Sequence, residues 1–218
     1  EDYGMYFVLF NFSLLFNIIL DLGITNFNNK HITQNNNLLT KYFSGITVFK
    51  MMLFVIYLVV TFGVGWVMGY DSERFFVLLF LSINQFLVSF IQYLRSNITA
   101  LQLYKTDSFL SVLDNTLMIV FCAILLWGNV FDFPFTIRHF IYAQTLAYAI
   151  TTIIVFSIVI TKTTHFIFTI DGSFLKQILK QTFPYALLVL TMVFYYRIDA
   201  VMLDIMLPDG ERQVAIYA

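Results

Sequence analysis

Six stretches of the chain contain no Asp, Glu, Lys or Arg and are almost entirely apolar. They are 16 to 22 residues long and cover residues 3–20, 51–70, 75–94, 115–131, 140–161 and 181–196. An α-helix needs about 17–25 such residues to cross about 30 Å of hydrocarbon. Strands of a transmembrane barrel would alternate apolar and polar residues instead. Because a backbone in lipid must satisfy its own hydrogen bonds, the pattern predicts membrane-spanning helices.

The pattern therefore predicts an all-α integral membrane protein with about six transmembrane helices. Their expected ranges are 4–22, 46–69, 74–95, 110–128, 138–161 and 183–205. We expect these helices to pack into a single transmembrane lobe that covers residues 1–218.

The composition excludes a water-soluble domain. The chain is 60% hydrophobic and 11% charged, whereas soluble domains carry about 25% charged residues. The net charge of −1 provides no basic surface, so we expect no nucleic-acid partner. Cys122 is the single cysteine and excludes an intrachain disulfide.

Lys and Arg are unevenly distributed between the two ends of the predicted helices. The segments 21–50, 95–114 and 162–180 contain eight of them, and the opposite side contains four. The positive-inside rule places these three loops in the cytoplasm and residue 1 outside. A chain that starts outside and lacks an initiator Met is expected to be missing an upstream helix.

The sequence contains no recognisable catalytic constellation. The pattern offers no spaced metal-ligand pair on a helix, no Gly-rich phosphate loop, and no Ser or Cys nucleophile near a His. We therefore expect no enzymatic activity, no cofactor and no metal ion.

Two charges interrupt the last apolar stretch. Arg197 and Asp199 lie inside a helix if it extends to residue 203. A charge at that depth costs at least about 2.5–3.5 kcal/mol unless it faces protein or water. The two residues are therefore candidate site residues. The alternative is that they end the helix at the outer interface.

Other candidates are polar residues near the ends of predicted helices. Arg95 ends the third helix, and Gln92 and Gln85 precede it on one side, so we expect these amides to face the interior of the bundle. Asp21 and Asn17 lie one turn apart where the first helix ends.

Asp114 is expected to open the fourth helix, where a carboxylate favours the positive helix end. For Asp21, Arg95 and Asp114, ordinary interface charges are the alternative interpretation.

Five short motifs occur in a characteristic order along the chain. They are Tyr3-Gly4-Met5-Tyr6, Asp21-Leu22-Gly23-Ile24-Thr25-Asn26, Tyr196-Arg197-Ile198-Asp199-Ala200-Val201-Met202-Leu203, Leu207-Pro208-Asp209-Gly210 and Ala215-Ile216-Tyr217-Ala218. Together they resemble the polysaccharide biosynthesis proteins, the O-antigen or lipid-linked oligosaccharide flippases of the multidrug/oligosaccharidyl-lipid/polysaccharide exporter superfamily. The resemblance covers the whole chain, although the family usually has Gly where Ala215 stands.

The resemblance implies a MATE-like, two-lobed transporter of the bacterial cytoplasmic (inner) membrane, acting in lipopolysaccharide biosynthesis. The chain would be most of its N-terminal lobe, truncated at both ends. The implied function is to flip polyprenyl-pyrophosphate-linked oligosaccharide by alternating access. The implied partners are the lipid bilayer, this lipid-linked substrate and a coupling ion, H⁺ or Na⁺.

The resemblance also suggests roles for the candidate residues. Arg197 and Arg95 would bind the anionic head group. Asp199, Asp21 and Asp114 would pair with these arginines or respond to the coupling ion. The remaining candidates for substrate binding are Gln92, Gln85 and Asn17.

Two other functions stay open at this point. A drug/cation antiporter of the same superfamily would prefer a carboxylate deep in the lobe, whereas the acidic groups here are predicted at helix ends. A membrane-embedded glycan enzyme is disfavoured by the short outer loops and by the lack of a deep His or acid pair.

Overall fold

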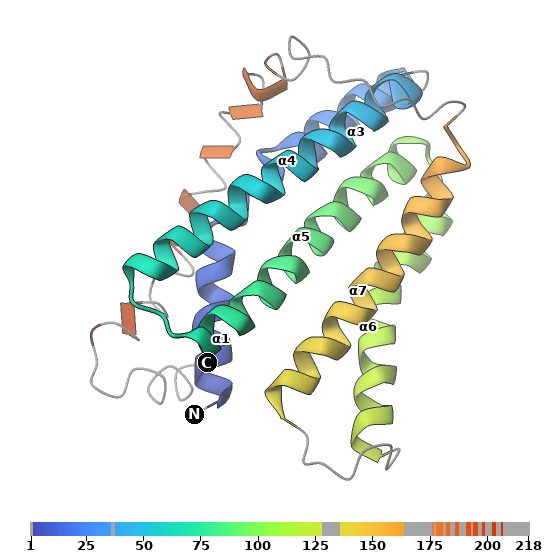
Figure 1. Ribbon diagram of the computed structural model, residues 1–218. Helices are drawn as coiled ribbons and strands as arrows, with labels where there is room; N and C mark the ends of the chain where they lie inside the picture. The colour runs from blue at the N-terminus through green and yellow to red at the C-terminus, as the bar shows by residue number, and fades with distance from the viewer. Residues whose placement is uncertain are drawn as a thin grey trace.

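The computed structural model describes residues 2–35, 38–127 and 136–163, together with scattered residues between 176 and 206. Its elements are α1 (Asp2–Leu15), α2 (Ile18–Asp21), α3 (Ile24–Gln34), α4 (Leu38–Val67), α5 (Ser72–Ala100), α6 (Tyr104–Trp127) and α7 (Ile137–Ile160). Every element in the described ranges is a helix (Figure 1), which confirms the predicted all-α class.

Four helices in the described part of the chain, α4 to α7, are long and apolar enough to cross a membrane. The segments Tyr3–Leu15 and Ile18–Gln34 pass the same test together and are bent by 43° at the break between them. Counted as one broken span, this pair brings the number in the described residues to five, in rough agreement with the expected six. Most of the helix expected over 183–205 lies outside the described residues.

The helices extend beyond the apolar stretches that predicted them. Helix α4 begins at residue 38 rather than 46, α5 ends at 100 rather than 95, and α6 begins at 104 rather than 110. The expected loops 21–50 and 95–114 are therefore largely helical, and residues 101–103 alone join α5 to α6. Hydropathy detects the part of a helix that lies in hydrocarbon, whereas backbone hydrogen bonds continue into the polar interface.

Helix α3 is the clearest case of this difference. Its Asn-rich sequence falls within the expected loop 21–50, yet it is helical to Gln34. Ile24, Asn28 and Ile32 repeat every four residues and are all buried. Such spacing forms one face of a helix, and this face packs α3 against α5.

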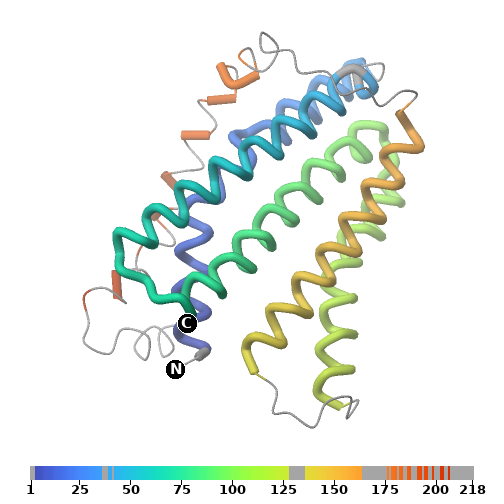
Figure 2. Tube along the Cα trace, viewed as in Figure 1, coloured from blue at the N-terminus to red at the C-terminus, as the bar shows by residue number. Residues whose placement is uncertain are grey.

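Helix α5 is the centre of the bundle. It contacts α1, α3, α4, α6 and α7, and in Figure 1 it lies between the α3–α4 side and the α6–α7 side. The ends of the helices alternate. In Figure 2 the N-terminus and the turn between α4 and α5 lie at one end of the bundle, and the junctions α3–α4 and α5–α6 lie at the other. This alternation matches the predicted topology.

Candidate functional site

The first membrane span is interrupted twice: it bends by 43° between Leu15 and Ile18, and a left-handed turn separates α2 from α3. Asn17 precedes the short helix α2, and Leu22 and Gly23 follow it with φ of 47° and 76°, both in the left-handed region. A helix end leaves backbone carbonyl groups without helical partners. In a membrane these groups must find partners within the protein, because each unsatisfied group costs several kcal/mol.

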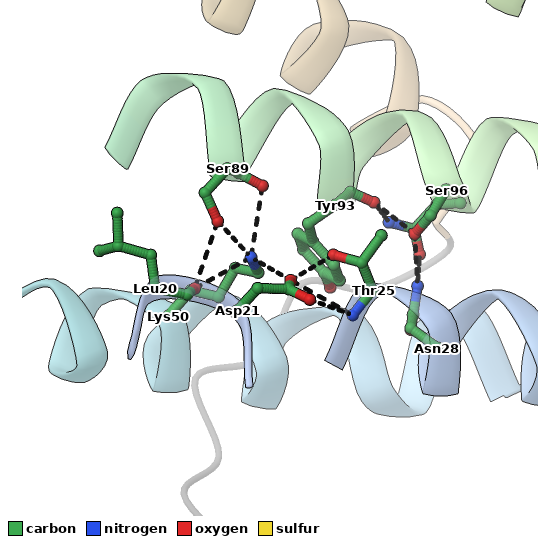
Figure 3. A network of polar contacts seen from close by, with 9 residues as sticks. Leu20, Asp21, Thr25, Asn28, Lys50, Ser89, Tyr93 and Ser96 are labelled. Atoms are coloured by element: carbon green, nitrogen blue, oxygen red, sulfur yellow. Dashed lines mark hydrogen bonds and ion pairs between the residues drawn. The ribbon is translucent and has the colours of Figure 1, made fainter. Parts of the chain in front are cut away.

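Lys50 supplies a partner for the end of α2. Its side chain is 1% exposed. The ammonium Nζ donates to the Leu20 carbonyl (3.2 Å) and to Asp21 Oδ1 (2.8 Å), and it reaches both the carbonyl (3.3 Å) and Oγ (3.0 Å) of Ser89. Figure 3 shows the ammonium between α4 and α5, with the break beside it. It also lies 5.6 Å from the ring centroid of Tyr93, within the range of a cation–π interaction.

Asp21 has a second role beside its ion pair with Lys50. Its carboxylate accepts hydrogen bonds from the hydroxyl of Thr25 and from the Thr25 backbone N–H, with Oδ1 at 3.3 Å from that nitrogen. The carboxylate thus caps the first turn of α3, where negative charge is favoured. Asp21 is the last residue of α2, close to the expected end of the first helix, but the bent segment continues through α3 to Gln34 instead of entering a loop.

The expectation that Lys50 is a loop cation is also wrong. Lys50 directly precedes a charge-free stretch, so hydropathy assigns it to the membrane interface. On α4, however, it shares a face with Phe43, Ile46, Leu53 and Tyr57, all of which are buried. The spacing of three and four residues across these five positions is the pattern that could have identified Lys50 as an inward-facing residue.

A second polar network crosses the bundle through the amide side chains. Asn17 donates to Gln85 (3.3 Å), and the neighbouring Asn84 donates to Gln144 of α7 (3.2 Å). Gln144 in turn donates to the Tyr148 hydroxyl (3.4 Å). The structure therefore brings the candidates Asn17 and Gln85 together inside the bundle.

Gln92 does not join this network. It is exposed, and Val88, Arg95 and Thr99 on the same side of α5 are only partly buried. Packing in the described part of the chain covers Gln85, whereas this side of α5 is less covered from Val88 onward. The expected inward orientation of Gln92 is therefore wrong.

Arg95 lies inside α5, which continues to Ala100, rather than at a helix end. Its Nε and Nη2 donate to the two carboxylate oxygens of Asp107 on α6, at 2.7 and 3.2 Å. The side chains are 27% and 19% exposed, respectively. This is the paired, fork-like geometry by which Arg binds carboxylates and phosphates. Asp107 was not among the candidates, because its partner is fixed only by the packing of α6 on α5.

Asp114 lies at the middle of α6 rather than at its start. Helix α6 runs over 24 residues from Tyr104, and Asp114 is the eleventh. Its expected position at the positive end of a helix is therefore wrong. The sequence-based argument against an antiporter, that the acidic residues lie at helix ends, does not hold for Asp114. Its carboxylate interacts electrostatically with Tyr148 of α7. Within the described ranges, no Lys, Arg or His forms an ion pair with it.

The remaining two candidates, Arg197 and Asp199, lie outside the described residues. Within the residues that the structure describes, no group of three or more His, Cys, Asp or Glu side chains could hold a metal ion. The described site is thus a set of buried and partly buried hydrogen bonds and ion pairs between helices.

Comparison with known proteins identifies the family. A family model described as polysaccharide biosynthesis protein matches residues 1–218. No curated protein and no solved structure matches the chain. Because the family model spans every helix and every polar network described above, the chain belongs to the polysaccharide biosynthesis protein family.

Proposed function

We propose that this chain is part of a transporter that flips polyprenyl-pyrophosphate-linked oligosaccharide units across the bacterial cytoplasmic membrane by alternating access. The family match over the whole chain is the observation that carries this proposal. The physical need is clear, since neither a glycan nor a pyrophosphate crosses hydrocarbon unaided. Polar networks enclosed by apolar helices support a lobe of a MATE-like transporter, and the O-antigen class of glycan is its proposed substrate.

Arg95 is the candidate ligand for the pyrophosphate group among the described residues. Its guanidinium already binds a carboxylate in a bidentate manner, and the same fork matches phosphate oxygens. The pair is only partly buried, so a phosphate oxygen could replace Asp107. Arg197 is proposed as a second phosphate ligand. The other candidates, Asp199, Asp114, Gln92, Gln85 and Asn17, are proposed to line the route or to respond to a coupling ion, H⁺ or Na⁺.

The test compares two arginines in the complete transporter. Arg95→Gln removes the proposed phosphate ligand, and Arg138→Gln removes an arginine that pairs with Glu73 and is 51% exposed. Flipping of a fluorescent polyprenyl-pyrophosphate oligosaccharide is measured in proteoliposomes at matched protein levels. Losing a charge-assisted bidentate contact should slow flipping at least about tenfold, while the Arg138 variant stays near wild type. An unchanged rate for Arg95→Gln would remove Arg95 from the site.

A drug/cation antiporter is the second candidate, because Asp114 provides the carboxylate at mid-helix depth that such a transporter would prefer. The two functions differ in a simple assay. Expression of the complete protein in a strain without drug efflux should leave its sensitivity to cationic drugs unchanged if the protein is a flippase. Resistance that is lost on Asp114→Asn would favour the antiporter instead.

A further inference from the structure

We propose that Lys50 is the positioning residue of the broken first span. Its ammonium anchors the end of α2, the short helix that directly follows the 43° bend, and so holds the bend and presents Asn17 to Gln85 on the central helix. The proposal rests on the proposed function in one respect: the bend shapes one wall of the transport route. The bend itself is a property of the protein that can be measured without substrate.

The acceptors around Nζ explain why a lysine stands at this position. Oxygens of Leu20, Asp21 and Ser89 converge on one point that has no access to solvent. An ammonium has three donors on one atom and no acceptor. An amide would bring its own carbonyl oxygen into this cluster, and a guanidinium spreads its donors over a fixed planar fork instead of placing them on one atom.

The left-handed turn after α2 is not formed by its backbone alone. Gly23 adopts a positive φ readily, but Leu22 at φ 47° does not, because its Cβ approaches the following carbonyl oxygen. A conformation of this kind persists when the surroundings hold it in place. The contacts that surround it are the Lys50 ion pair on one side and the Thr25 cap of Asp21 on the other.

Lys50 acts on Asn17 through the short helix α2. Leu20, whose carbonyl binds Lys50, lies three residues after Asn17, and the Leu20 N–H donates to the Asn17 carbonyl (2.9 Å). Displacing Leu20 therefore displaces Asn17 and its bond to Gln85.

Helix α3 is docked independently of this contact. Asn28 donates to Asn97 (2.9 Å) and to Ser96 (3.2 Å) on α5. Loss of Lys50 should therefore change the bend and leave α3 in place on α5.

The test measures the bend by electron spin resonance in a Cys122→Ala background, which removes the single native thiol. Spin labels are attached at Tyr3 on α1 and Thr33 on α3, both exposed. The wild-type protein should show one narrow distance distribution. Lys50→Met should shift or broaden it, whereas Lys105→Met, at an exposed lysine of α6, should not. An unchanged distribution in Lys50→Met would overturn the proposal.

A second variant covers the case in which Lys50→Met does not accumulate. Lys50→Met combined with Asp21→Leu removes both charges of the ion pair, so that no buried charge is left without its partner. The proposal expects the double variant to show an altered distance distribution and flipping slowed about tenfold. Wild-type distances and rates in the double variant would show that the pair contributes stability alone, and would overturn the positioning role. If the variants alter the bend but the wild-type protein itself does not flip lipid-linked oligosaccharide, the positioning role stands and the proposed function is refuted.

Discussion

Serine residues on the central helix combine two properties that membrane helices need at an interface. Ser82, Ser89 and Ser96 repeat every seven residues along α5, and all three are buried. A small side chain allows helices to approach closely, and its hydroxyl can bond across the interface. Ser89 binds Lys50, and Ser96 accepts a bond from Asn28. These two residues connect α5 to the broken span at separate points.

Ser89→Ala should destabilise the protein more than an equivalent change elsewhere. The hydroxyl accepts from Lys50 and donates to the Leu20 carbonyl (3.3 Å). Losing a bond to a buried charge costs about 1.5–3 kcal/mol. Ser108→Ala is the matched control, because this exposed hydroxyl bonds only to the Tyr104 carbonyl in the described structure. Thermal unfolding in detergent should show a clear fall in midpoint for Ser89→Ala and little change for Ser108→Ala. Equal shifts would contradict the role of Ser89.

The sequence predicts those parts of the helices that lie in the hydrocarbon of the membrane, because only there must the side chains be apolar. The four spans α4 to α7 follow from apolar stretches of the right length. The break at Leu22 and Gly23 could not be recognised, because a glycine after an apolar stretch also ends an ordinary helix. Helix α3 was missed for a related reason. Its buried face consists of Ile24, Asn28 and Ile32, and the Asn, Lys and Gln residues around this face give the segment the composition of a polar loop.

Gly23→Ala tests whether the break needs its left-handed conformation. At φ 76° an added Cβ introduces strain of about 1–2 kcal/mol. Gly63→Ala is the matched control, because an added Cβ there meets nothing within 4 Å and alanine favours a helix interior. Chemical unfolding should show lower stability for Gly23→Ala and unchanged or higher stability for Gly63→Ala. A Gly23→Ala protein as stable as wild type would mean that the turn tolerates a side chain.

Helix α5 contacts every other described helix. Single polar residues could therefore be identified from the sequence, but their partners on other helices could not. Polarity at membrane depth pointed to Asn17, Gln85 and Arg95. The partners were not evident. The spacing along α4 marks Lys50 as inward-facing, but which residues Lys50 and Asp107 contact is fixed only when α4 and α6 pack against α5. The pairs Asp21–Lys50 and Arg95–Asp107 each join two helices. Hydropathy locates helices along the chain but does not show how they pack against one another.

The final prediction concerns the orientation of the bundle in the membrane. Lys50 is buried and cannot count toward the positive-inside rule, yet the other Lys and Arg residues retain the same bias. We therefore expect the end with the α5–α6 connection to face the cytoplasm and the α4–α5 turn to face outside. In the Cys122→Ala background, a membrane-impermeant maleimide should label Ser72→Cys in intact cells. It should label Lys105→Cys only after permeabilisation. Both positions are exposed. Ser72 begins α5 and Lys105 lies in the first turn of α6, and these two helix starts lie at opposite ends of the bundle (Figure 1). The reverse pattern would invert the orientation, and would place Arg95 and Asp107 near the outer face, where a head group leaves the transporter rather than enters it.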